Sequence, residues 1–383
     1  MLFSFFIYLT AAFLMFQWGK LCVPASGISL KQQAERNFLG QFLFIATFVF
    51  IAGARYNVGV DYMSYLSIYE DYATKGHTRR ETLEPLFVYI SLFLGKNGFH
   101  YCIYFSLWAF IQIFFVVKAV KHERELLPYI GAFIFLHSFF LNWMNGIRQC
   151  IVECVFFWAL LFVKQKKLLI YLLVIYICSF MHTSAYFLMP LCLLSFFNIS
   201  PKYRKSLLIL IIACTIIGNV PSWIQSLSSL ENILGAYGFE TYAEALNTQI
   251  ENEDLLRETA WGPSRISIFL ISCIIIWYAP KIKEQIQEKT SMFSIYFSLF
   301  VIGTALYGLF ANTTHIFLRP IDYFTFFRLP LMAYTAIYLW NNKKLLMFSF
   351  FIFLSFLPTV SAIIKGAINP NDTYSLYHFF FMI

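Results

Sequence analysis

The chain has 383 residues, of which 60% are hydrophobic and 20% aromatic, and its mean hydropathy is +0.67. This composition excludes an ordinary soluble domain and is typical of a membrane protein with many spans. The formal net charge is +8. We attribute this charge to lysines at the cytoplasmic ends of spans, so no nucleic-acid partner is expected.

Apolar blocks follow one another along the chain and predict an all-α polytopic membrane protein with about twelve transmembrane helices, within a range of about 10–13. A further block at 84–95 is too short to span comfortably, and treating it as a re-entrant or interfacial helix puts every lysine cluster on one side. We therefore expect both termini outside and a single transmembrane domain over residues 1–383. The spanning blocks lie at about 1–19, 38–54, 99–118, 127–143, 149–163, 168–181, 184–197, 206–222, 264–280, 291–311, 327–340 and 345–364.

Lysine and arginine separate to opposite sides in this topology. The inner side holds 14 Lys and 3 Arg, whereas the outer side holds 3 Lys and 8 Arg. Lysine alone is sufficient to mark a cytoplasmic face. Arginine can in addition bind phosphate or carboxylate through two parallel hydrogen bonds, and it keeps its charge. The outer face, with longer elements at 55–98, 223–263 and 312–326, is therefore expected to bind an anion.

The first outer segment begins with Arg55 at the end of a span, followed by Gly59 for a turn and Asp61 as the N-cap of a helix. Tyrosines follow on one face of that helix. They suit an aromatic belt at the headgroup level, and equally a platform for sugar rings beside an arginine. The tyrosines chosen as candidates are Tyr62, Tyr65 and Tyr69.

Ionisable residues near the starts of later spans are the next candidates. Arg148 enters the span at 149–163, and Glu153 lies deeper in that span, where a charge is costly. Their spacing of five residues makes a poor intrahelical pair, so each is expected to find a partner on another helix. His182 separates two apolar blocks at the outer edge and could accept a proton from a substrate hydroxyl.

The last outer segment contains Arg319, and Arg328 follows it inside the apolar run of the next span. Nine residues apart, the two arginines would face opposite ways on a continuous helix, so only a bend would let them grip one group together. No zinc, phosphate-loop or nucleophile-elbow motif occurs in the sequence. A metal held by Asp61 and Glu84 is not required by their spacing, so no metal site is predicted.

In the order of its motifs, the chain resembles the EpsG-type and Wzy-type polysaccharide polymerases of bacterial envelopes. The resemblance covers about residues 50–330. It rests on five motifs, which are Arg55-x-x-Val58-Gly59-x-Asp61-Tyr62, Glu84-Pro85-Leu-Phe87, Ile147-Arg148-Gln149, Phe180-x-His182-x-Ser184, and the late Arg328.

The resemblance implies a GT-C-like fold and a glycosyltransferase in the bacterial cytoplasmic (inner) membrane, active on its outer or periplasmic face. It would transfer a growing glycan from undecaprenyl diphosphate to a hydroxyl of the next lipid-linked repeat unit. Donor and acceptor are both lipid-linked oligosaccharides, a chain-length regulator protein would be a further partner, and no cofactor or metal is needed.

The resemblance also implies roles for the candidate residues. The base would be His182 or Asp61, since either can take the proton of the acceptor hydroxyl. Arginines would bind the leaving lipid diphosphate, and glycan would contact the tyrosines and Glu84. The diphosphate set comprises Arg148, Arg328, Arg55 and Arg319.

Two other functions of the same envelope chemistry stay open. A lipid-linked oligosaccharide flippase should show repeat symmetry and charges deep in several helices, but we find no repeat and only Glu153 at depth. A membrane O-acyltransferase would favour a catalytic histidine on the cytoplasmic side or at mid-membrane, and His122 is the histidine there.

Overall fold

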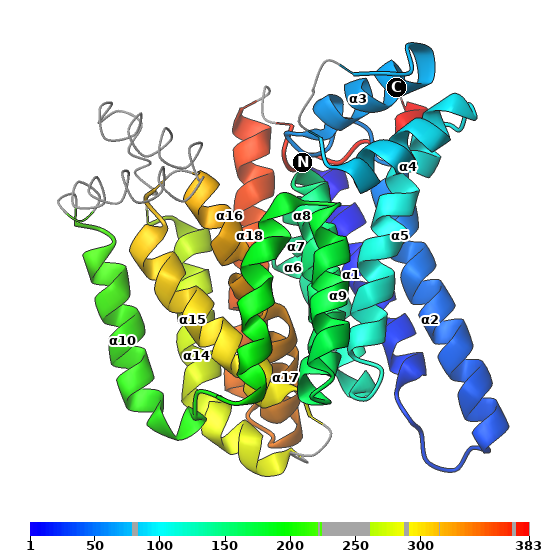
Figure 1. Ribbon diagram of the computed structural model, residues 1–383. Coiled ribbons are helices and arrows are strands. Elements are labelled where there is room, and N and C mark those ends of the chain that lie inside the picture. The colour runs from blue at the N-terminus through cyan, green and yellow to red at the C-terminus, as the bar shows by residue number, and fades with distance from the viewer. Residues whose placement is uncertain are drawn as a thin grey trace. The chain divides into compact units, whose positions relative to one another are not determined.

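The computed structural model describes residues 1–78, 83–220, 223, 261–286, 291–313, 315–369 and 373–382. The chain divides into two compact units (Figure 1), residues 1–197 with 332–383 (unit 1) and residues 198–331 (unit 2). Within the described residues, six helices are long and apolar enough to cross a membrane, so the chain is a multi-pass membrane protein. They are α1 (Leu2–Cys22), α2 (Leu30–Gly53), α5 (Tyr101–Ala119), α14 (Pro263–Gln285), α15 (Phe293–Phe310) and α18 (Leu345–Ile368).

Two further helices form one bent pair, which has the length and apolarity of a broken seventh span or of a re-entrant loop. The 3₁₀ turn η1 (Arg124–Leu126) leads into α6 (Leu127–Leu136), and α7 (Phe139–Asn145) follows after a bend of 68°. At the break Ser138 has φ +60°, and its amide donates to Thr359 Oγ1 on α18 at 3.0 Å. The Thr359 side chain thus accepts a hydrogen bond from an amide that has no helical partner at the bend. A buried polar backbone group needs such a partner.

The remaining predicted blocks form helices that do not qualify as spans by length and apolarity. Most are too short, and α8 contains too many charged residues. The predicted polytopic helical fold is therefore confirmed. The number of about twelve spans stays a prediction. The block at 84–95 is a single helix of 12 residues, α4 (Pro85–Lys96). The others are α8 (Ile147–Lys164), α9 (Leu168–Ser179), the 3₁₀ helix η2 (Thr183–Ser195), α10 (Arg204–Ile217) and α17 (Arg328–Asn341), with short 3₁₀ turns η3 (Pro201–Tyr203) and η6 (Phe380–Met382).

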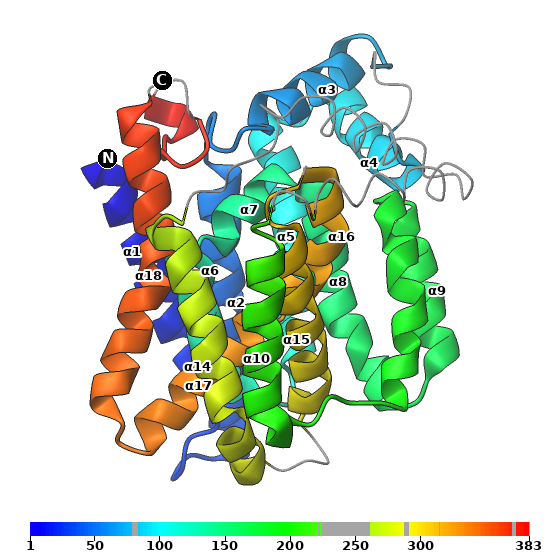
Figure 2. The same cartoon turned by 90° about the vertical axis from the view of Figure 1, so that its left-hand side faces the viewer.

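In unit 1, α3 (Tyr62–Thr74) and α4 lie side by side at the end that also holds both chain termini (Figures 1 and 2). The C-terminal segment is tied there, because the Tyr377 amide donates to Ser4 Oγ at 2.9 Å and the Gly59 amide to the Thr373 carbonyl at 2.9 Å. This arrangement puts the first outer segment and the two termini on one side, as the sequence predicts.

The turn before α3 depends on Gly59. Its φ is +104°, and a Cβ there would lie 2.9 Å from Asn145 Oδ1, so glycine brings this loop against the end of α7. Asp61 occupies the N-cap position of α3, but its side chain makes no capping hydrogen bond. The predicted side-chain cap was wrong, because the Asp61 backbone is helical (φ −86°, ψ −1°) rather than in the extended conformation typical of an N-cap.

Unit 2 is built from α10, α14, α15 and α16 (His315–Thr325). Helices α10 and α15 approach closely, because a Cβ on Gly218 would lie only 2.0 Å from the Gly308 carbonyl oxygen. The outer element expected at 223–263 lies outside the described residues except for Trp223 and residues 261–263.

Candidate functional site

Glu84 is the centre of a polar cluster in unit 1. One carboxylate oxygen, Oε1, accepts from His182 Nδ1 at 2.8 Å and from the Thr183 amide at 3.2 Å. The other, Oε2, accepts a charge-assisted hydrogen bond from Arg148 Nη1. Three segments that are far apart in the sequence therefore meet on one carboxylate.

The backbone around each residue explains how they meet. Glu84 precedes Pro85, the first residue of α4, and its extended conformation (φ −66°, ψ 141°) is the one that a following proline favours. The next amide, on Leu86, donates to the Phe180 carbonyl at 2.9 Å and so ties α4 to the segment that carries His182. Arg148 stands in the first turn of α8, directly after α7.

Neighbouring charge and hydrogen bonds keep the Glu84 carboxyl ionised despite its burial. Burial raises the pKa of Glu84, but the hydrogen bond from His182 and the charge of Arg148 outweigh it and lower that pKa to about 2. An ionised carboxylate only accepts, so a neutral His182 ring carries its proton on Nδ1 and leaves Nε2 with a free lone pair. The His182 side chain is 16% exposed.

Arg148 links the cluster to α3. Its guanidinium lies beside the buried Tyr65 hydroxyl and stands 5.4 Å from the centre of the Phe87 ring. Four of the residues chosen from the sequence thus form one connected site, in which hydrogen bonds join Arg148, Glu84 and His182, and Tyr65 lies next to Arg148. We call it the Glu84 cluster.

Arg55, by contrast, lies inside unit 1. It is 1% exposed, donates from Nε to the Val58 carbonyl at 3.2 Å and from Nη1 to the Ala52 carbonyl, and packs on the rings of Tyr62 and Phe105. These contacts support the turn before α3, and a role in diphosphate binding stays a prediction.

All three candidate tyrosines are also buried. Tyr62 stacks on Phe105 and Tyr69 on Tyr104, each with ring centroids 4.6 Å apart. Their burial accounts for helix packing, so a direct contact with glycan stays a prediction for all three. Asp61 is exposed, and its role as a base also stays a prediction.

Glu153 is buried on α8 and accepts a hydrogen bond from Gln149 Nε2 at 3.3 Å. The sequence predicted that Glu153 and Arg148 would not pair within their helix, and in the structure Arg148 pairs with Glu84 instead. The expectation of a partner on another helix was met for Arg148, whereas for Glu153 this bond comes from one turn earlier on its own helix.

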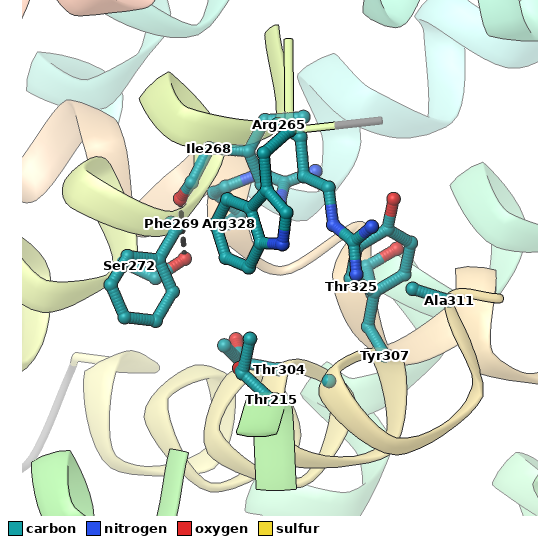
Figure 3. A pocket seen from close by; sticks show the side chains of 12 residues that line it. Thr215, Arg265, Ile268, Phe269, Ser272, Thr304, Tyr307, Ala311, Thr325 and Arg328 are labelled. Atoms are coloured by element: carbon teal, nitrogen blue, oxygen red, sulfur yellow. Dashed lines mark hydrogen bonds between the residues drawn. The ribbon is translucent and has the colours of Figure 1, made fainter. Parts of the chain in front are cut away.

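Unit 2 holds a separate pocket with two arginines. Arg328 lines it from the start of α17, and Arg265 lines it from the first turn of α14 (Figure 3). Arg265 donates to Asn312 Oδ1 at 3.2 Å and Asn219 Oδ1 at 3.4 Å, and stacks 4.7 Å from the Trp261 ring centre. The sequence analysis did not single out Arg265, although it enters an apolar block as Arg328 does.

The two arginines predicted in the last outer segment take different positions within unit 2. Arg319 is exposed on α16, while Arg328 follows a break in the helix at residues 326–327. Burial raises the pKa of Asp322, between them, to about 7, and the charges of Arg328 and Arg319 oppose that rise only in part. The segment does bend, but Arg319 does not line the pocket with Arg328.

A model of the EpsG family matches residues 40–379 of the chain. No curated protein and no solved structure matches the sequence significantly. The match covers every residue of the Glu84 cluster and of the unit 2 pocket.

Proposed function

The chain belongs to the EpsG family, which comprises Wzy-type polysaccharide polymerases, and from this premise we propose that it polymerises lipid-linked repeat units with His182 as its base. The observation that carries the proposal is the hydrogen bond from His182 Nδ1 to Glu84, a carboxylate that stays ionised. A carboxylate on one ring nitrogen orients the imidazole and leaves the other to accept a proton.

The proposed reaction joins two lipid-linked chains. A hydroxyl of the incoming repeat unit attacks the anomeric carbon of the growing glycan, and its proton passes to His182 Nε2. The bond from the anomeric carbon to the lipid diphosphate breaks, and the lipid diphosphate leaves with the electron pair. Glu84 stabilises the imidazolium that forms, because an ion pair with a carboxylate favours the protonated ring.

Arg148 has a positioning role in this proposal. Its charge holds Glu84 ionised, and its second contact, to Tyr65, fixes the cluster against α3. Because Glu84 already compensates its charge, Arg148 contributes less to anion binding than an uncompensated arginine would. The outer face of a bacterial cytoplasmic membrane and undecaprenyl diphosphate as the carrier complete the proposal, and both come from the family likeness.

Complementation in a host that lacks the gene tests the function. Wild type should restore a ladder of surface glycan on a gel, and His182→Ala should leave glycan capped with a single repeat unit. His77→Ala is the matched control, because His77 is exposed outside the cluster and should restore the full ladder.

Other gel patterns would contradict the proposal. Loss of every repeat in the deletion host would point to a flippase, and a normal ladder with altered substituents would point to an acyltransferase. A full ladder from His182→Ala would remove His182 from the reaction.

A further inference from the structure

The pocket in unit 2 is chemically unlike the Glu84 cluster. Two arginines line it, and among the described residues that line it none is acidic. We propose that this pocket binds the phosphate groups of a lipid, namely the diphosphate of the lipid-linked glycan, with Arg265 as its principal cation. This inference rests on the proposed function, since it gives that reaction its substrate-binding site.

The geometry of Arg265 suits an anion. Asn312 and Asn219 orient its guanidinium through amide oxygens at 3.2 and 3.4 Å. Asn312 is itself fixed, because its Nδ2 donates to the Gly218 carbonyl at 2.9 Å. A guanidinium held in one orientation binds phosphate with little further loss of side-chain entropy.

Hydroxyl groups line the wall opposite. Figure 3 shows Thr215 and Thr304 across the open space of the pocket from Arg265. The Thr215 hydroxyl donates to the Ile211 carbonyl at 2.8 Å within its own helix. Thr304 and Tyr307 are three residues apart on α15, so they share one face and can donate to phosphate oxygens.

Much of the remaining lining is apolar, which favours a lipid over a free anion. Ile268, Phe269 and Ala311 form walls suited to hydrocarbon, and Trp261 is 44% exposed beside Arg265. Tryptophan is enriched where headgroups meet the hydrocarbon. A cationic end with apolar walls therefore matches an amphiphile whose phosphate lies at the bilayer surface.

Binding without turnover tests this proposal. The probe is farnesyl diphosphate, added to the purified full-length protein in detergent, with affinity measured by calorimetry. Arg265→Gln should weaken binding about tenfold or more, the loss expected for one charge-assisted contact of roughly 1.5–3 kcal/mol. Arg265→Lys should lose less, since it keeps the charge but not the fork.

The matched control is Arg204→Gln. Arg204, also in unit 2, stacks 4.5 Å from the Trp277 ring centre and resembles Arg265 in that contact, but it does not line the pocket. It should bind the probe like wild type. If Arg265→Gln fails to fold, Thr304→Val tests the same pocket with nearly unchanged volume, and it should weaken binding several-fold.

Two results would overturn the proposal. Equal affinity of wild type, Arg265→Gln and Thr304→Val for farnesyl diphosphate would show that the probe does not bind in this pocket. Equally tight binding of dioleoylphosphatidylglycerol, with the same dependence on Arg265, would keep a lipid-phosphate site but assign it to ordinary membrane lipid. Since no turnover is measured, either result would leave the gel test of His182 standing, and a full ladder from His182→Ala would leave this binding result standing.

Discussion

Replacing Glu84 by glutamine removes one negative charge from the Glu84 cluster and almost no volume. The lowering of its pKa from 4.5 to about 2 corresponds to about 3 kcal/mol, at 1.36 kcal/mol per unit. The Arg148 and His182 side chains are 19% and 16% exposed, so solvent screening reduces this to about 1–2 kcal/mol.

That energy sets the scale of the expected loss of rate. If Glu84 stabilises the imidazolium of His182 in the transition state by about 1–2 kcal/mol more than it stabilises the neutral ring, the polymerisation rate of Glu84→Gln should fall about 5- to 30-fold. The assay is the initial rate of oligomer formation by purified protein from a lipid-linked repeat unit.

Stability gives an independent reading of the same variant. A carboxyl with a lowered folded-state pKa stabilises the fold above its unfolded pKa, and this contribution disappears as the pH falls from 4.5 to about 2. The difference in melting temperature between wild type and Glu84→Gln should therefore be constant above about pH 5 and shrink below it.

Glu70→Gln is the control, because Glu70 is exposed on α3 outside the cluster, and it should not change the rate. A lower melting temperature for Glu84→Gln with a wild-type rate would refute the reasoning, since Glu84 would then act only in folding.

Three further predictions concern other positions. Arg148→Lys should insert normally but lower polymer yield on gels about tenfold, because lysine keeps the charge and loses the fork that holds Glu84; a normal yield would contradict this role. Asp322→Asn should raise the melting temperature at pH 7 and above but not near pH 4. The native pKa of about 7 makes ionisation of Asp322 cost stability as pH rises from 3.8; a difference independent of pH would count against it. Gly59→Val should destabilise the protein by about 1–3 kcal/mol in denaturant unfolding, because valine is strained at φ +104° and its Cβ meets Asn145; unchanged stability would show that the loop relaxes.

The sequence predicts the helices well because each apolar block carries its own signal. The block at 99–118, for example, is α5 (Tyr101–Ala119) to within two residues at each end. The bend between α6 and α7 was not predicted, since a sequence pattern does not show that Thr359 would satisfy the amide of Ser138, 221 residues earlier. Length alone makes 127–143 look continuous.

The candidate site was predicted in its members but not in its connections. His182 and Arg148 were chosen as ionisable residues at span ends, whereas Glu84 was assigned to glycan. Its position beside both depends on a pairing across 64 and 98 residues, which local spacing does not encode. Arg265 was missed because its partners Asn219 and Asn312 lie in the turns after α10 and α15. An arginine at the start of a span also carries no motif of its own.

The most direct measurement is the reaction of purified protein with a single lipid-linked repeat unit, resolved on a gel. The account predicts lipid-linked products of two and more repeats from wild type, and none from His182→Ala protein of the same melting temperature. Oligomers from His182→Ala at the wild-type rate would contradict the central claim. So would the absence of oligomers from folded wild-type protein.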